Sequence, residues 1–290
     1  MGDVLECVVN VSEGRDAAVV EELAAACDPV LLDVHIDPDH HRSVFTLGGV
    51  GESVEESVRA LAAAVVARID VSEHVGVHPR IGALDVVPFV NLVGGALVGS
   101  AGLPGLVDGP DGPALSARDR FGRWAGESLG LPCFLYGPER TLPELRRLAW
   151  QGLQPEFGPS VPHPSAGAAA VGARRVLVAY NLWLASADLT LARLIATALR
   201  GPGVRTLALQ VGEEVQVSCN LIDPWNVGPG AVFDAVASQA GISRAELVGL
   251  VPRGVLHAEP RHRWKELDLD PSKTIEARLE MAGLDGGRFV

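Results

Sequence analysis

The spacing of apolar and polar positions predicts a first set of strands and helices in the N-terminal half. Helices are expected at Ala17–Ala26, with Asp16 as its N-cap, and from a capping-box pair, Ser53 and Glu56, to about Ile69. Apolar, valine-rich runs predict strands at Val4–Val11, Val30–Ile36, Ser43–Leu47 and Leu84–Val93. The expected order is therefore β-α-β-β-α-β.

Two segments rich in glycine and proline, 94–114 and 152–172, are expected to be loops. Between them the pattern predicts a helix at Ser116–Leu129, a strand at Cys133–Tyr136 and a helix at Leu142–Gln151. For the second of these loops the alternative is a long linker between the lobes, but a loop of this length in a compact protein is more often functional than idle.

The C-terminal half repeats the first order. The pattern predicts a strand at Val176–Leu184, a helix around Leu191–Leu199, a hairpin of Thr206–Val211 with Val215–Leu221, a helix at Val232–Ala240 and a strand at Leu247–Pro252. One further helix is expected near Ser272–Ala282. The fold class is therefore α/β (α+β), with two ferredoxin-like βαββαβ lobes related by duplication and a ligand cleft between them. The expected lobes are residues 1–173 and 174–290.

Composition restricts the function. With 48% hydrophobic and 21% charged residues, the chain is globular. It lacks an apolar run of the roughly 18–20 residues that a spanning helix needs, and its first residues, MGDVLEC, lack the features of a signal peptide, so a cytoplasmic protein without a membrane partner is expected. A net charge of −12 argues against nucleic acid. The four cysteines form no CxxC pair, which argues against a zinc or disulfide framework.

The segment HVGVHPRIGALD, residues 74–85, has the residue types of a reactive centre. Gly76 and Pro79 argue for a loop that leads into the Leu84 strand. In such a loop, a histidine near Arg80 and Asp85 suits general acid–base work. A turn histidine that only binds backbone groups is the alternative.

The segment DVHIDPDHH, residues 33–41, offers candidate metal ligands in Asp37, Asp39, His40 and His41. No HExxH or CxxC motif completes a shell, and an acidic hairpin turn explains the same residues. Arg42, which follows the turn, is suited to binding a carboxylate. A third candidate, GPSVPHPSAG at residues 158–167, combines glycines that permit close approach to a flat ligand with prolines that stiffen the loop.

Seven segments in one order together resemble the formiminotransferase family, the folate-dependent glutamate formimidoyltransferases without a cyclodeaminase domain. They are ECVVNVSEGRD (6–16), LLDVHIDPDHHRSVFTLGG (31–49), HVGVHPRIGALDVVPF (74–89), FLYG (134–137), FGPSVPHPSAGAAAVGARRVLVAYN (157–181), QVSCNL (216–221) and VGLVP (248–252). They extend over nearly the whole chain, so the resemblance is far more specific than any single motif.

The resemblance implies two ferredoxin-like lobes that hold folate between them. It also implies that the protein forms a homodimer. It also implies transfer of a formimino group from N-formimino-L-glutamate to tetrahydrofolate, which gives 5-formimidoyltetrahydrofolate and L-glutamate in one-carbon metabolism and histidine degradation. Tetrahydrofolate is the co-substrate and no metal is used. The catalytic general acid/base carries over to His78. The folate-contacting loop carries over to Gly158, Pro159, Ser160, Val161, Pro162, His163, Pro164, Ser165, Ala166 and Gly167. Expected substrate-contacting or orienting residues are His41, Arg42, His74, Arg80 and Asp85.

This chain departs from the family at several positions near the expected centre. Val75 and Val77 replace the lysine and glutamate of HKGEHPR, His41 replaces an asparagine, and Trp183 replaces a second asparagine. Two alternatives follow: a divergent transferase that moves a formimino or formyl group to or from another amine, or a folate binder without turnover. A third, unrelated alternative is a metal-dependent hydrolase that uses Asp37, Asp39, His40, His41 and His74.

Overall fold

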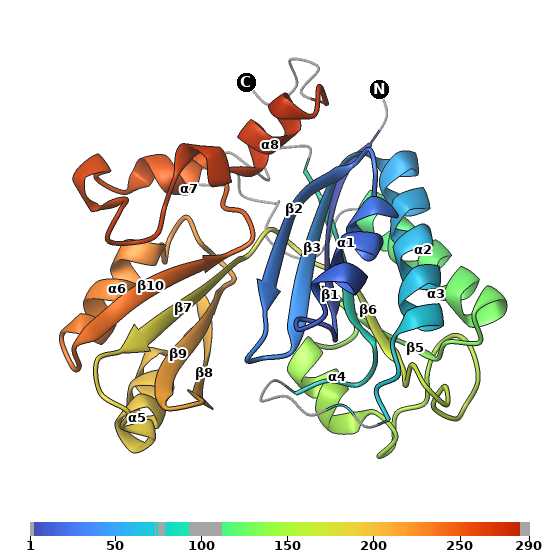
Figure 1. The fold of residues 1–290 in the computed structure, drawn as a ribbon, viewed down its shortest axis with the longest axis horizontal. Helices are drawn as coiled ribbons and strands as arrows, with labels where there is room; N and C mark the ends of the chain where they lie inside the picture. The colour runs from blue at the N-terminus through green and yellow to red at the C-terminus, as the bar shows by residue number, and fades with distance from the viewer. Residues whose placement is uncertain (1–2, 73, 75–78, 93–111, 285–290) are drawn as a thin grey trace. The chain divides into compact units, whose positions relative to one another are not determined.

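We describe a computed structural model of the chain, which covers residues 3–72, 74, 79–92 and 112–284. The chain divides into two compact units between Arg175 and Val176, and each has its own sheet and its own apolar core. The protein is therefore a two-unit α/β protein, as the duplicated pattern predicts. The units are described separately below (Figure 1).

The N-terminal unit has a six-stranded sheet in the order β2-β3-β1-β4-β6-β5. Its strands are β1 (Val4–Val11), β2 (Leu31–Asp37), β3 (Arg42–Val50), β4 (Leu84–Asn91), β5 (Cys133–Tyr136) and β6 (Ala169–Ala173). β1 pairs antiparallel with β3 and β4, and β2 pairs antiparallel with β3, so the first four strands have the ferredoxin-like order. β6 and β5 extend this sheet by parallel pairing beyond β4.

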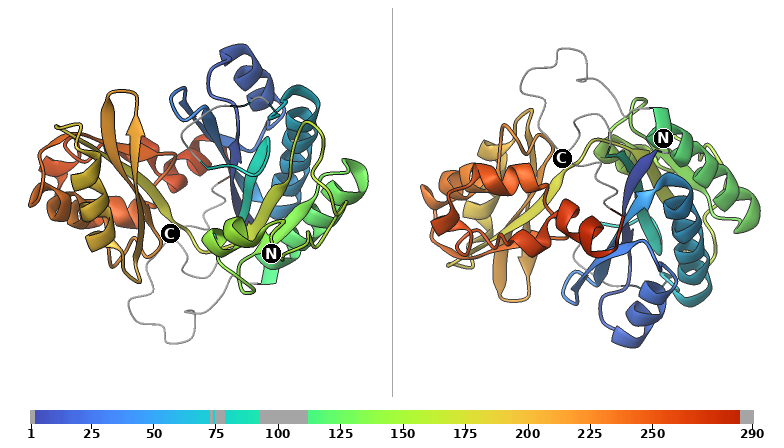
Figure 2. Two further views of the ribbon diagram at one scale, coloured as in Figure 1. Left: turned by 90° about the horizontal axis from the view of Figure 1, so that it is seen from below. Right: turned by 90° about the horizontal axis from the view of Figure 1, so that it is seen from above.

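Helices cover both faces of this sheet. On one face α1 (Ala17–Ala25), α2 (Gly51–Arg68) and α3 (Gly112–Ser128) bury strand residues such as Phe45, Val87 and Phe89. Figure 2 shows α2 and α3 side by side along this face. On the other face α4 (Leu142–Leu148) packs Leu145 against Val86 and Phe134. Neighbouring strand residues point to opposite faces, which is why Val86 and Val87 belong to different cores.

The C-terminal unit is a four-stranded antiparallel sheet in the order β10-β7-β9-β8. Its elements are β7 (Val178–Leu184), α5 (Leu189–Leu199), β8 (Val204–Val211), β9 (Glu214–Leu221), α6 (Pro229–Ala237) and β10 (Ile242–Val248), which is the ferredoxin-like βαββαβ order. Helices α7 (Arg253–Ala258) and α8 (Ile275–Met281) follow, with 3₁₀ turns at Arg261–Arg263 and Pro271–Lys273. Residues of α5 and α6 pack on the alternate strand positions Val178, Tyr180 and Leu182.

Several local predictions were wrong. A helix was expected to begin with the capping pair Ser53 and Glu56, but α2 begins at Gly51, directly after β3. The Gly51 amide donates a hydrogen bond to the Asp3 carbonyl at 2.9 Å. The segment 152–172, expected to be loop throughout, contains the start of β6. The last strand is Ile242–Val248 rather than 247–252.

Candidate functional site

Polar residues gather at one end of the N-terminal sheet. Asn10 lies near the end of β1, Arg42 begins β3, and Asp85 is the second residue of β4. β1 runs antiparallel to both neighbours, so the end of β1 meets the beginnings of β3 and β4. Three segments that are far apart in the sequence therefore meet at this end of the sheet.

Asp85 is the anionic centre of this group and is fully buried. Its Oδ2 accepts hydrogen bonds from Arg42 Nη1 at 2.7 Å and from Arg146 Nη2 at 2.6 Å. Its Oδ1 accepts one from the Ile81 amide at 2.8 Å, and Arg42 Nε donates to Asn10 Oδ1 at 3.1 Å. Burial alone would raise the pKa of Asp85, but the Arg42 and Arg146 guanidinium groups hold it below its usual range. Asp85 is therefore a permanent anion near neutral pH.

The turn between β2 and β3 is held by its own acidic residue. Asp37 Oδ1 accepts from the amides of Asp39 at 3.0 Å and His40 at 2.8 Å, and Asp37 Oδ2 pairs with His40 Nδ1. Asp37 and His40 are thus engaged with each other in an Asx-type turn. This geometry supports the acidic-turn interpretation of DVHIDPDHH over a metal shell built from Asp37, Asp39 and His40.

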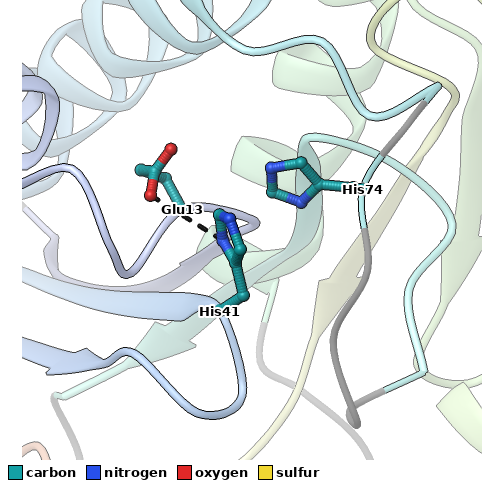
Figure 3. A group of neighbouring side chains, drawn as sticks. All are labelled: Glu13, His41 and His74. Carbon is teal, nitrogen blue, oxygen red and sulfur yellow. Dashed lines mark ion pairs between the residues drawn. The ribbon is translucent and has the colours of Figure 1, made fainter.

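The next residue, His41, faces two side chains from other segments (Figure 3). Its ring centroid is 3.9 Å from that of His74, with the ring planes at 55°, and its Nδ1 is 3.7 Å from Glu13 Oε1. His41 has φ of 50°, a left-handed conformation that costs a non-glycine residue roughly 1–2 kcal/mol. Strain of this kind is concentrated at functional sites.

Glu13 is fixed by the backbone that follows it. Its Oε1 accepts from the amides of Gly14 at 2.8 Å, Arg15 at 2.7 Å and Asp16 at 3.0 Å. Burial would raise the pKa of Glu13, but these amides and His41 lower it. Gly14 is required here, because a Cβ at this position would lie 2.5 Å from the Arg42 amide nitrogen.

Arg80 connects the two histidines. Its Nη1 lies 2.9 Å from His74 Nδ1 and donates to the His41 carbonyl at 3.3 Å, while its Nη2 donates to the His40 carbonyl at 2.9 Å. Burial lowers the pKa of both His41 and His74, and the positive charge of Arg80 lowers them further. Both rings are therefore neutral at neutral pH.

The loop 158–167 ends beside this cluster. The Ser165 carbonyl accepts from the Val71 amide at 2.8 Å, and the Ala166 carbonyl accepts from the Ala83 amide at 2.9 Å. His163 and Gly167 exchange backbone hydrogen bonds at 2.7 and 2.9 Å, which closes the end of the loop. The stretch 158–162 is exposed, and Val161 keeps 66% of its surface accessible. The loop is therefore hydrogen-bonded to neighbouring segments at residues 165 and 166 and exposed at residues 158–162.

The structure brings together five residues singled out from the sequence: His41, Arg42, His74, Arg80 and Asp85. His78, together with Val75 and Val77, lies outside the described residues. Sequence reasoning missed Glu13, Asn10 and Arg146. Glu13 and Asn10 stand at the end of the first strand, a place where polar residues often serve a site, and this signal was available. Arg146 has no such signal, because its role depends on where α4 packs.

Two α/β units with a histidine-, arginine- and carboxylate-lined site and a Gly/Pro loop are features of an enzyme with a small-molecule substrate. The family model of the formiminotransferase domain, N-terminal subdomain, matches residues 4–174. The chain belongs to the formiminotransferase family, and this membership makes it a transferase.

The relatives differ in length. A glutamate formimidoyltransferase of Streptococcus pyogenes is 29% identical, with 95% of this chain and 98% of the relative covered. One of Thermoplasma acidophilum is 32% identical, with 96% and 98% covered. The formimidoyltransferase-cyclodeaminase of Sus scrofa is 34% identical over 98% of this chain but only 57% of its own length. The chain thus matches the shorter relatives end to end and part of the longer one.

None of the helices in the described part of the chain is long and apolar enough to cross a membrane.

Proposed function

We propose that the chain transfers the formimino group of N-formimino-L-glutamate to tetrahydrofolate, giving 5-formimidoyltetrahydrofolate and L-glutamate. The observation that carries this proposal is the near end-to-end match to two glutamate formimidoyltransferases, each covered over 98% of its length. The cluster around Asp85 adds a site of suitable chemistry at the residues that the resemblance indicates.

His78 acts in this proposal as the general acid/base. N5 of tetrahydrofolate attacks the formimino carbon and forms a C–N bond, and the proton it loses passes to the His78 imidazole. The same proton returns to the glutamate nitrogen as the original C–N bond breaks, so no net proton is gained or lost. A group with an ordinary pKa of about 6.5 suits both transfers. Holding both amines together contributes further through proximity.

Asp85 acts through Arg42 in this proposal. Both of its oxygens are engaged by Arg42, Arg146 and the Ile81 amide, so the carboxylate fixes the guanidinium of Arg42 and the start of the segment 81–85. Arg80 contacts both His41 and His74, and these three residues are proposed to orient the substrate. Residues 158–167 are proposed to contact folate, because residues 158–162 are exposed and residues 165 and 166 are hydrogen-bonded beside the cluster.

Three further features are proposed with the function. The subdomain boundary lies at residues 173 and 174, close to the division between Arg175 and Val176. The protein works as a cytoplasmic homodimer. Tetrahydrofolate is its co-substrate, and small-molecule amines rather than nucleic acid or membranes are its partners, in keeping with the net charge of −12.

Val75 and Val77 motivate a second candidate function. Two apolar side chains at these positions change the polarity expected beside His78, which favours either a different amine as donor or acceptor, or folate binding without turnover.

Purified protein is incubated with tetrahydrofolate and N-formimino-L-glutamate, and formation of 5-formimidoyltetrahydrofolate is followed by absorbance and mass spectrometry. Transfer at a catalytic rate supports the proposal. Folate binding by calorimetry without transfer from any formimino or formyl amine contradicts it in favour of a binder.

The His78→Ala variant tests the catalytic assignment. We expect turnover to fall by about 10²–10⁴-fold, the usual contribution of a general acid/base, with little change in unfolding temperature. His262→Gln is the matched control, because His262 is exposed in the C-terminal unit and should leave turnover unchanged. Retention of full activity by His78→Ala would exclude His78 as the proton-transfer group.

A further inference from the structure

Glu13, His41 and His74 place three potential metal-ligand atoms within 4.8 Å of one another. The three residues come from the segment after β1, from the turn before β3 and from the segment before β4. Figure 3 shows the two imidazole rings and the carboxylate turned toward a common space. Around a tetrahedral Zn²⁺, neighbouring ligand atoms lie about 3.3 Å apart. The 3.7 Å between His41 Nδ1 and Glu13 Oε1 is already near that spacing.

Two of the three side chains are held in place before any ion arrives. Glu13 accepts hydrogen bonds from three consecutive backbone amides, the kind of support that orients a ligating carboxylate. His41 is fixed by a left-handed backbone whose carbonyl accepts from Arg80. Its Nδ1 is buried and has no hydrogen-bond partner among the described residues. Leaving a buried nitrogen without a partner is unfavourable, and a metal ion would supply the missing partner.

The types of ligand atom at the site also suit a metal. His41 and His74 each offer one imidazole nitrogen, and Glu13 offers a carboxylate oxygen. Two neutral imidazoles and one carboxylate form the donor set of the 2-His-1-carboxylate sites, which bind first-row divalent metals and leave positions open.

Arg80 and Arg15 reduce the affinity of this site for a metal ion. Because Arg80 donates to His74 Nδ1, the proton of the neutral His74 ring sits on Nε2. Binding of a metal through Nε2 moves that proton to Nδ1 and breaks the Arg80 contact. The positive charges of Arg80 and Arg15 also act on both histidines and oppose a cation. The affinity is therefore weaker than that of a closed structural site.

We propose that Glu13, His41 and His74 form a binding site for one divalent transition metal of the Zn²⁺ class, with an open position for water or a substrate group. The site goes beyond the proposed transfer reaction, and it does not depend on which amine takes part. The four cysteines are buried and do not compete for the metal.

Metal binding to the whole, chelator-treated protein tests the proposal. Co²⁺ is titrated while the visible d–d absorption is recorded, and Zn²⁺ is titrated in competition with a chromophoric chelator. We expect one equivalent to bind to the wild-type protein. His41→Gln and His74→Gln should each weaken binding by at least about tenfold. His262→Gln, which alters an exposed histidine of the C-terminal unit, should bind like the wild type.

A variant that is expected to tighten Zn²⁺ binding distinguishes a specific site from a general loss of folding. Arg15→Gln removes a positive charge that acts on both histidines, so it should tighten Zn²⁺ binding by a few-fold. Zn²⁺ should also raise the unfolding temperature of the wild type and not that of His41→Gln. The proposal is overturned if the His41 and His74 variants, folded by circular dichroism, bind Zn²⁺ as the wild type does, or if the wild type binds no equivalent.

Discussion

Asp85 on β4 and Arg42 on β3 form an ion pair of 2.7 Å although β1 lies between their strands. The pair crosses the end of the sheet, where Asn10 of β1 accepts from the same guanidinium at 3.1 Å. Arg146 brings α4 to the same carboxylate at 2.6 Å. One buried carboxylate therefore joins two strands and a helix, and its partner Arg42 directly follows His41 in the chain.

Replacing Asp85 with asparagine should destabilise the N-terminal unit strongly. The change leaves the guanidinium groups of Arg42 and Arg146 without their shared anion, and breaking a buried ion pair from one side costs about 3–5 kcal/mol. Urea unfolding followed by circular dichroism measures the loss. Glu22→Gln is the control, because its ion pair with Arg68 is about half exposed on both sides and is worth less than about 1 kcal/mol. A loss for Asp85→Asn no larger than for this control would refute the structural role.

Acid should destabilise the protein through the same carboxylate. The pKa of Asp85 in the folded protein is lower than in the unfolded chain. Its contribution is therefore fully present above the unfolded pKa of about 3.9 and is lost as pH falls from there through the folded pKa. Unfolding free energies measured from pH 6 to pH 2 should fall more steeply below about pH 4 for the wild type than for Asp85→Asn. Parallel curves for the two proteins would contradict this assignment.

Gly14→Ala should disturb the support of Glu13 and the start of β3. An added Cβ would lie against the Asp37 carbonyl and 2.5 Å from the Arg42 amide nitrogen, and backbone atoms cannot move aside cheaply. Overpacking of this kind costs about 1–3 kcal/mol. Gly201→Ala is a matched control, since nothing lies within 4 Å of its Cβ position. Thermal unfolding of the two variants should separate them clearly, and equal stability would count against the close approach.

The four cysteines should resist thiol reagents in the folded protein. All are buried, and burial raises the pKa of Cys27, Cys133 and Cys219 to about 12 and that of Cys7 well above its usual value. Thiolate, the reactive form, is therefore scarce at pH 8. A chromogenic disulfide reagent should label none of the thiols rapidly in buffer and all four in guanidinium chloride. Rapid labelling of one thiol in buffer would show that it is accessible.

The elements that the sequence predicted well are those with a continuous apolar pattern. The strands β1 and β7 and the hairpin of β8 and β9 lie close to their expected positions, because valine and leucine on one face must be buried. The strand β6, AAVGA, was missed since small residues carry no such pattern. Only its position between β4 and β5 makes it a strand. β10 was displaced because it is an edge strand with a mostly half-exposed pattern.

By itself the sequence determined the duplicated order of strands and helices, the segments that carry chemistry and the family to which they belong. These features are local, because they depend on residue type and spacing. Only the tertiary structure decided that Glu13 faces His41 and His74, that Asp85 binds Arg42 and Arg146, and that the end of the 158–167 loop lies beside Ala83. Such contacts depend on strand register and helix packing. Arg42 and Asp85, for example, are separated by more than 40 residues in the chain, and no short sequence pattern encodes their contact.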